Sequence, residues 1–175
     1  IDHLSAPDRC HKGISRSFQI PQPFGGLSVL ENTFVAAAHG ARLETIKANE
    51  ICIQILEQTG LLSKANHLAN SLTLLERKRL ELARALCAKP KILLLDEIAG
   101  GLTESECQSL INTINKIKES GIAIIWIEHI VHALLSIVDR LIVINFGAKI
   151  ADGEPKKIMA SKAVKEIYIG IEADA

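Results

Sequence analysis

Several common features are missing from this sequence, namely a net charge, a long apolar run and an initial methionine. The 20 basic side chains balance the 20 acidic ones, which argues against a dedicated nucleic-acid-binding protein with its usual basic excess. The longest apolar runs, such as Ile122–Ile127, are far shorter than the roughly 20 residues needed to cross a bilayer. We therefore expect no nucleic-acid partner and no membrane-spanning helix.

The cysteines and the single methionine indicate the cellular compartment and the state of the polypeptide. The four cysteines are widely scattered without a C-x-x-C pair, which indicates buried thiols in a reducing compartment rather than disulfides or a zinc site. The only methionine is Met159, and no signal peptide is visible at the start. We expect a cytoplasmic protein whose sequence here is processed or part of a longer polypeptide.

The pattern along the chain changes character three times. Residues 1–24 are punctuated by proline and glycine and predict a loop-like segment, whereas 25–88 carry helical periodicity. Residues 89–155 alternate apolar runs (92–95, 122–127 and 141–144) with helices, and 156–175 predict a helical extension. Strands separated by helices predict an α/β fold, a parallel sheet with helical crossovers, joined here to an all-helical lobe.

Three S/T-x-x-E patterns predict where helices begin. They start at Ser28, Thr73 and Thr103, and each has a glutamate three residues later, as in a capping box. The helix expected after Thr103 should bury a single face, made of Cys107, Leu110, Ile111, Ile114 and Ile117.

Two expected strands end in ionisable pairs. The run 92–95 leads into Asp96 and Glu97, and the run 122–127 leads into Glu128 and His129. Functional side chains gather at the carboxyl ends of parallel strands, where one carboxylate can hold Mg²⁺ while another orients a water molecule. Taken alone, the same residues favour a loop cap, a solvated acid and a packed histidine over a functional site.

The segment Thr73–Glu76 also allows two interpretations. A capping box needs no function, and the following Arg77, Lys78 and Arg79 fit a solvated basic face. A helix amino terminus with positive charge nearby also favours phosphate, so a phosphate contact stays open here.

The order of these features resembles the ATP-binding cassette (ABC) ATPases, and within them the ATPase subunits of branched-chain amino acid uptake systems. The similarity covers nearly the whole chain. It is carried by Gly13-Ile14-Ser15-Arg16-Ser17-Phe18-Gln19, Leu27-Ser28-Val29-Leu30-Glu31-Asn32, Ala99-Gly100-Gly101-Leu102, Glu128-His129, Asp152-Gly153-Glu154-Pro155 and Tyr168-Ile169-Gly170.

The resemblance implies a partial P-loop NTPase fold and a set of catalytic roles. Asp96 would bind Mg²⁺ through water, and Glu97 would be the general base for hydrolysis of ATP. Gln19 would contact Mg²⁺ and the attacking water, and His129 would contact the γ-phosphate.

The resemblance also implies cofactor contacts shared with a second subunit. Thr73, Leu74, Leu75 and Glu76 would form the signature segment that closes over a partner's ATP, and Gly100 and Gly101 would belong to the D-loop. By the same resemblance, 1–24 would be a remnant of the nucleotide-binding core with the glutamine loop, and 89–155 the core with Walker B and the switch histidine.

Two departures from the family pattern bear on the chemistry. No lysine in this sequence is followed by serine or threonine, so the phosphate-binding P-loop, G-x-x-x-x-G-K-[ST], is absent. Leu74 and Leu75 stand where the family usually has two glycines, and Ile98 replaces the usual proline. We therefore expect this chain to be inactive by itself.

These observations together predict an ATP-hydrolysing subunit of an ABC importer for branched-chain or similar amino acids. It would lie at the cytoplasmic face of the inner or plasma membrane as a peripheral subunit. Its partners would be a second ABC ATPase subunit and a membrane permease docked on the helical lobe. Two alternatives stay open, namely a degenerate, nonhydrolytic nucleotide-binding partner subunit and a soluble ABC ATPase.

Overall fold

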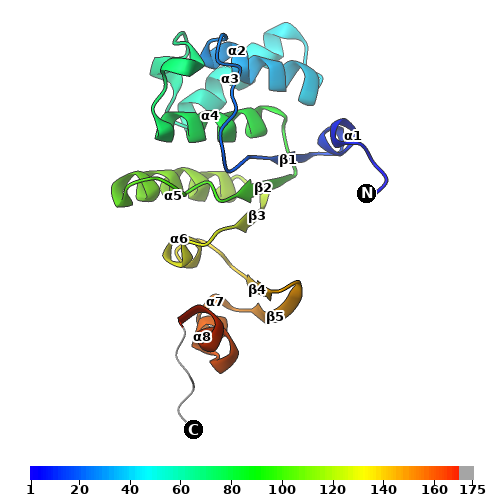
Figure 1. Cartoon of the computed structure of the whole chain (residues 1–175). Coiled ribbons are helices and arrows are strands. Elements are labelled where there is room, and N and C mark those ends of the chain that lie inside the picture. The colour runs from blue at the N-terminus through cyan, green and yellow to red at the C-terminus, as the bar shows by residue number, and fades with distance from the viewer. Residues whose placement is uncertain (170–175) are drawn as a thin grey trace. The chain divides into compact units, whose positions relative to one another are not determined.

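A computed structural model of the chain describes residues 1–169 and divides into two compact units, Ile1–Ile130 and a second that begins at Val131 (Figure 1). The division lies within the α/β segment expected over 89–155. Gly170 of the Tyr168-Ile169-Gly170 phrase and the last part of the 156–175 extension lie outside the described residues. Each unit is described by itself.

The first unit contains the expected helical lobe. Its elements are α2 (Val29–Val35), the π-helix η1 (Ala36–Gly40), α3 (Thr45–Gln58), the short helices η2 (Leu62–Lys64) and η3 (Ala69–Ser71), and α4 (Leu74–Cys87). Two apolar clusters hold these helices together. One is built around Val29, Leu56 and Leu80, and the other around Cys52 and Cys87, all fully buried. Burying such side chains contributes about 1.5–3 kcal/mol for each of the larger ones.

All three predicted capping boxes are present. At Ser28, Thr73 and Thr103 the hydroxyl accepts from the backbone N–H of the third following residue, and the glutamate there accepts from the N–H of the capping residue. The same backbone hydrogen bond lowers the pKa of Glu31, Glu76 and Glu106. The caps therefore fix where α2, α4 and α5 begin.

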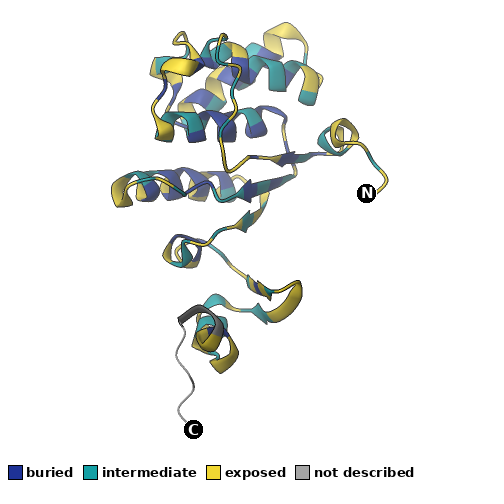
Figure 2. Ribbon diagram, in the orientation of Figure 1, coloured by how far each residue is buried: buried dark blue, intermediate teal, exposed yellow. Residues whose placement is uncertain are grey.

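A three-stranded parallel sheet lies in the same unit. It has the order β1-β2-β3, formed by β1 (Ile14–Arg16), β2 (Ile92–Asp96) and β3 (Ala123–Ile127). Ile92 of β2 aligns with Ile14 on one side and with Ala123 on the other. The connection from β2 to β3 passes through α5 (Glu104–Glu119), whose buried face contains the five predicted residues and Thr113 (Figure 2).

The interpretation of residues 1–24 as a loop-like segment is wrong for residues 6–16 and holds for 17–24. Helix α1 (Ala6–His11), capped by Ser5, comes before β1, which joins the sheet. Gly13, with φ of +90°, makes the turn between them and accepts from the backbone N–H of Lys91 and Ile92. A strand of three residues is too short to show an apolar period, and its hydrogen bonds come from a segment distant in sequence.

The second unit corrects another expectation. It contains α6 (Val131–Leu135), β4 (Leu141–Asn145), β5 (Ala148–Gly153), α7 (Pro155–Ala160) and α8 (Lys162–Ile169). The run 141–144 was expected to be a third crossover strand, but β4 pairs antiparallel with β5 in a separate sheet. The reason is the two-residue turn Phe146–Gly147, with φ values of +44° and +78°, because two positive φ values define the tight turn that matches the twist of a hairpin.

Strand β3 forms the outer edge of the three-stranded sheet. Its Ile125 and Ile127 are 57% and 64% exposed, although β3 is made almost wholly of apolar residues. Among the described residues, no helix is long and apolar enough to span a membrane.

Candidate functional site

The carboxyl ends of the three parallel strands bring the predicted catalytic residues together. Gln19 follows β1, Glu97 follows β2, and His129 follows β3. The Gln19 side-chain amide donates to Glu97 Oε2 at 2.5 Å, and His129 Nδ1 lies 3.4 Å from the same oxygen. One carboxylate oxygen of Glu97 is therefore the meeting point of all three residues.

Glu97 is held in an unusual backbone conformation. Its φ is +43°, in the left-handed region that side chains other than glycine rarely adopt and that costs about 1–2 kcal/mol. Its backbone N–H donates to the Ile127 carbonyl at 2.9 Å, so the bonding between β2 and β3 continues to this residue. The local strain turns the chain sharply at the point where the carboxylate meets Gln19.

Asp96, the last residue of β2, forms an ion pair. Its Oδ2 accepts a hydrogen bond from Arg16 Nη2 at 2.6 Å, while the Arg16 guanidinium also lies 5.1 Å from the centre of the Phe18 ring. The Asp96 side chain is 30% exposed, so solvent reaches it beside the arginine. The sequence assigned no role to Arg16.

Glu128 is a buried carboxylate that the sequence analysis gave no role. Its side chain has 0% exposure, and Oε1 accepts from the Ala99 N–H at 2.8 Å. Oε2 accepts from the His129 N–H at 3.1 Å and from the Ile130 N–H at 3.4 Å. Glu128 thus ties the loop after β2 to the residues after β3. In the sequence, the only indication of this role for Glu128 is that an acidic residue directly follows an apolar strand.

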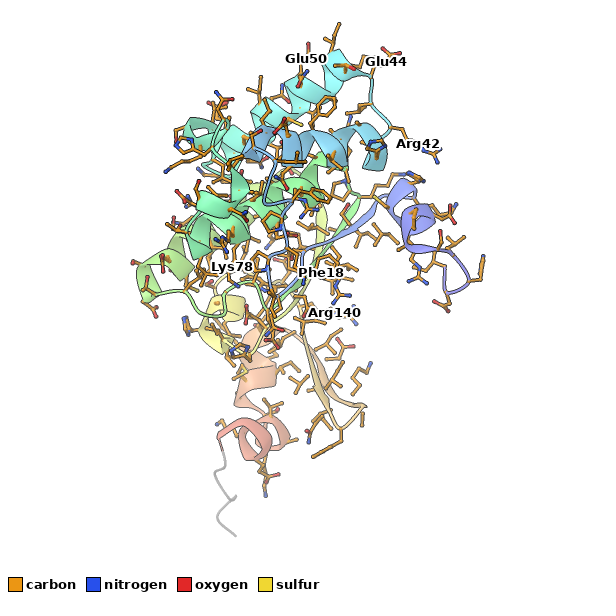
Figure 3. The ribbon with its side chains drawn as sticks, turned by 45° about the horizontal axis from the view of Figure 1, so that its top comes forward. Phe18, Arg42, Glu44, Glu50, Lys78 and Arg140 are labelled. Carbon is orange, nitrogen blue, oxygen red and sulfur yellow. The ribbon has the colours of Figure 1, made fainter. Side chains whose placement is uncertain are left out.

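Lys78 connects the helical lobe to this group of side chains. It is only 4% exposed on α4, and its ammonium donates to the backbone carbonyl of Gln19 at 3.4 Å (Figure 3). Burial lowers the pKa of the Lys78 ammonium, while the carboxylates of Glu128 and Glu97 act in the opposite direction. The sequence left open a solvated basic face or a phosphate contact for this region, and the burial of Lys78 excludes the solvated face for this residue.

A second contact from α4 holds the segment after Gln19. The Arg84 guanidinium donates to Glu81 Oε1 at 2.7 Å and to the Gln22 carbonyl at 3.1 Å, and it lies 5.0 Å from the centre of the Phe24 ring. Glu81 Oε1 also accepts from the Gln22 N–H at 3.0 Å. The glutamine segment is therefore attached to α4 at both Lys78 and the Glu81–Arg84 pair.

The segment Thr73–Glu76 forms the start of α4 beside the loop after β2. The Thr73 N–H donates to Glu76 Oε2 at 2.9 Å, and Leu74 is 45% exposed. A Cβ on Gly101, whose φ is +77°, would come within 3.3 Å of Leu74 Cδ2. A Cβ on Gly100 would lie 3.9 Å from His129 Cε1, so both glycines border site residues.

The sequence profile of the ABC transporter family matches residues 3–100, more than half of the chain. The chain belongs to the ABC transporter family.

Among curated relatives, the branched-chain amino acid transport ATP-binding protein BraF of Pseudomonas aeruginosa is 33% identical over 97% of this chain and 72% of its own length. The lipopolysaccharide export ATP-binding protein LptB of Haemophilus influenzae is 28% identical over 97% of this chain and 70% of its own length. This chain is therefore an ABC transporter ATP-binding subunit that resembles the branched-chain amino acid importer ATPases.

A solved structure supports the same assignment for the fold. The ADP conformation of MJ1267, an ATP-binding cassette of an ABC transporter, matches with a TM-score of 0.82 and 28% identity over 96% of this chain and 72% of that one. The expected α/β fold of the P-loop NTPase class is confirmed.

Proposed function

We propose that this chain contributes the water-activating half of an ATP-hydrolysing site in an importer for branched-chain or similar amino acids. The observation that carries the proposal is the convergence of Gln19 and His129 on Glu97 Oε2, at 2.5 and 3.4 Å, where three parallel strands end. The cargo is suggested by relatives such as BraF, whose name states branched-chain amino acid transport.

In the proposed reaction, water attacks the γ-phosphoryl group of ATP and gives its proton to Glu97, and the bond from the γ-phosphorus to the bridging oxygen breaks to release ADP. The Gln19 amide donates to Glu97 Oε2, which fixes the direction in which the carboxylate presents its other oxygen. His129 places Nδ1 near Glu97, which assigns its second ring nitrogen, Nε2, to a γ-phosphate oxygen. Most of the rate enhancement in such a reaction comes from positioning and from stabilisation of charge.

Asp96 and Gln19 are the residues we assign to Mg²⁺. They supply a carboxylate and an amide oxygen, which are ligands that Mg²⁺ accepts, and Mg²⁺ usually takes its remaining ligands from water and phosphate. When bound, Mg²⁺ would neutralise the charge of the phosphate groups.

We place the two proposed partners at the start of α4 and on the helical lobe. We assign Thr73–Glu76, with Gly100 and Gly101 beside it, to contacts with ATP held by a second ABC ATPase subunit. Phe18, Ile20 and Phe24 lie exposed on the segment that α4 holds, and we place the docking site of a membrane permease on this lobe. The subunit would then work as a peripheral protein at the cytoplasmic face of the membrane.

The 175 residues contain no P-loop, so we propose that they do not hydrolyse ATP by themselves. A second candidate, a nonhydrolytic nucleotide-binding partner subunit, is favoured by one observation. Leu74 covers Gly101 where the family usually has small residues, which limits how closely the backbone approaches a phosphate. A soluble ABC ATPase has no comparable support.

The decisive experiment measures ATP turnover in a longer version of the protein that carries a P-loop segment ahead of Ile1. Glu97→Gln should lower turnover by about 10²–10⁴-fold, the usual worth of a positioned general base, while ATP binding persists. Glu57→Gln, on the exposed side of α3, is the matched control and should leave turnover unchanged. Near-normal turnover in Glu97→Gln would remove Glu97 from the role of base, and absence of turnover in the parent protein would favour the nonhydrolytic candidate.

A further inference from the structure

A pocket of about 600 Å³ lies at the end of the sheet opposite the catalytic residues. Gly13 and Lys91, which line it, directly precede β1 and β2, whereas Gln19 and Glu97 follow those strands. Its walls come from α1, the end of η1 and the end of α4.

The charge of this pocket has one sign. The lining includes Lys12, Arg42, Lys89 and Lys91 but no aspartate or glutamate, in a chain whose acidic and basic residues are equal in number. None of the three lysines has an ion-pair partner within residues 1–169. The nearby Asp8 of α1 accepts from the Ser5 hydroxyl at 2.6 Å and does not line the pocket. Four cationic side chains with no acidic residue in the lining concentrate positive potential here, although Asp8 interacts electrostatically with Arg42 and reduces the potential at that side chain.

Arg42 is held in place by a histidine. Arg42 Nη2 lies 3.0 Å from His11 Nδ1, and His11 Nε2 lies 3.1 Å from the His39 carbonyl oxygen. Arginine can only donate, so Nδ1 must accept, and the ring proton is on Nε2, where it donates to the carbonyl. His11 is therefore neutral in this arrangement and orients the guanidinium without competing for an anion (Figure 3 labels Arg42).

Two of the four cationic residues have a strained backbone conformation. Arg42 and Lys89 have φ values of +54° and +53°, in the left-handed region where a residue other than glycine costs about 1–2 kcal/mol. Glycine or asparagine would fit these turns with less strain, yet both positions carry a long cationic side chain directed to one pocket.

We propose that this pocket binds an anion that bears phosphate groups, held by Lys12, Arg42, Lys89 and Lys91. Arginine and lysine side chains form charge-assisted hydrogen bonds with phosphate oxygens, and the volume accommodates a diphosphate group. The phosphate is supplied either by a small soluble compound or by the headgroup of an anionic lipid. The site is separate from the proposed hydrolytic site, because it lies at the amino ends of the strands and uses none of the same residues.

The test titrates the 175-residue chain with inorganic pyrophosphate in a calorimeter at low salt, and separately with vesicles that contain phosphatidylglycerol. The pocket variant is Lys89→Asn/Lys91→Gln, in which asparagine keeps the left-handed turn. Its affinity should fall roughly tenfold for the loss of two cationic contacts. The control Lys47→Gln/Lys116→Gln removes the same charge from exposed positions on α3 and α5 and should change affinity by less than about twofold.

A second measurement locates the bound anion. Cys10 lines the pocket and is half-buried, whereas the other three cysteines are buried, so alkylation of Cys10 should slow when pyrophosphate is present. Saturable binding of pyrophosphate or of vesicles that only the pocket variant weakens supports the proposal and identifies the source of the phosphate. Absence of binding to both probes, equal weakening in both variants, or unchanged alkylation of Cys10 with bound pyrophosphate overturns it.

Discussion

The side chain of Leu74, at the start of α4, lies against Gly101 in the loop after β2. A methyl group on Gly101 would come within 3.3 Å of Leu74 Cδ2. The leucine that replaces a usual glycine of the family thus contacts the loop that carries Gly100 and Gly101 in its own chain. The start of α4 and that loop are therefore packed together before any partner subunit is considered.

This contact makes Gly101→Ala destabilising for two separable reasons. The φ of +77° strains any residue with a Cβ, and the added methyl group crowds Leu74. We expect a loss of about 1–2 kcal/mol in the free energy of unfolding, measured by urea denaturation. Adding Leu74→Ala should recover the crowding component alone. If Gly101→Ala/Leu74→Ala regained the full parent stability after correction for Leu74→Ala, the backbone component would be refuted.

The left-handed conformation of Glu97 predicts an unusual order of stabilities. With φ of +43°, glycine should be tolerated better than alanine, so Glu97→Gly should be more stable than Glu97→Ala by about 1 kcal/mol. The matched pair at the exposed Glu50, in the middle of helix α3, should show the opposite order by a similar amount, because glycine weakens helices. Thermal and urea unfolding of the four variants measures both differences, and alanine proving better at both positions would contradict the assigned strain.

Glu128→Gln should destabilise the chain although it changes one atom. The carboxylate accepts from three backbone N–H groups, of Ala99, His129 and Ile130. In glutamine an NH2 group replaces one of the two oxygens, so a donor then faces one or two of these N–H donors. We expect a loss of about 1–3 kcal/mol, with faster hydrogen exchange at the Ala99 amide. Glu119→Gln, at the exposed end of α5, is the control and should change neither quantity. Unaltered exchange at Ala99 would show that Glu128 does not hold this loop.

The hairpin of β4 and β5 should respond to acid through Asp152. Arg140 donates to its two carboxylate oxygens at 2.7 and 2.8 Å and Lys149 donates at 3.1 Å, which together hold the pKa of Asp152 well below its usual range. Because the folded pKa is lowered, the stabilisation is present above the ordinary aspartate pKa of about 3.9 and is lost as pH falls towards the folded value. In Arg140→Gln, NMR titration of the carboxyl carbon should place this pKa closer to the ordinary value. An unshifted titration in that variant would show that Lys149 alone is responsible.

Local rules predicted the helix starts and the apolar helix faces, because capping and amphipathic periodicity depend on residues a few positions apart. Thr103 with Glu106 fixed one such start, and Cys107 to Ile117 gave the buried face of α5. The ends of β2 and β3 could also be predicted from the sequence, because the apolar runs stop at Asp96 and Glu128.

The missed features depend on partners distant in sequence. Lys78 is recognised as buried only because Gln19, Glu97 and Glu128 surround it, and its neighbours Arg77 and Arg79 give no sign of this. Arg16 is assigned a role only by its contact with Asp96 across two strands. The pairing of β4 was predicted wrongly because an apolar run does not show whether a strand pairs in parallel or antiparallel. The turn at Phe146–Gly147 determines the antiparallel pairing.

The open edge of β3 affects how this chain behaves in solution. Within residues 1–169 the outer edge of β3 has no strand partner, so it presents a row of backbone donors and acceptors that template the addition of another strand, and Ile125 and Ile127 add exposed apolar surface beside them. Proteins usually protect such edges with lysine, proline or a bulge, and none of these occurs between Ala123 and Ile127. Concentrated samples of this chain should therefore self-associate through β3, and a lysine in place of Ile125 should keep them monomeric.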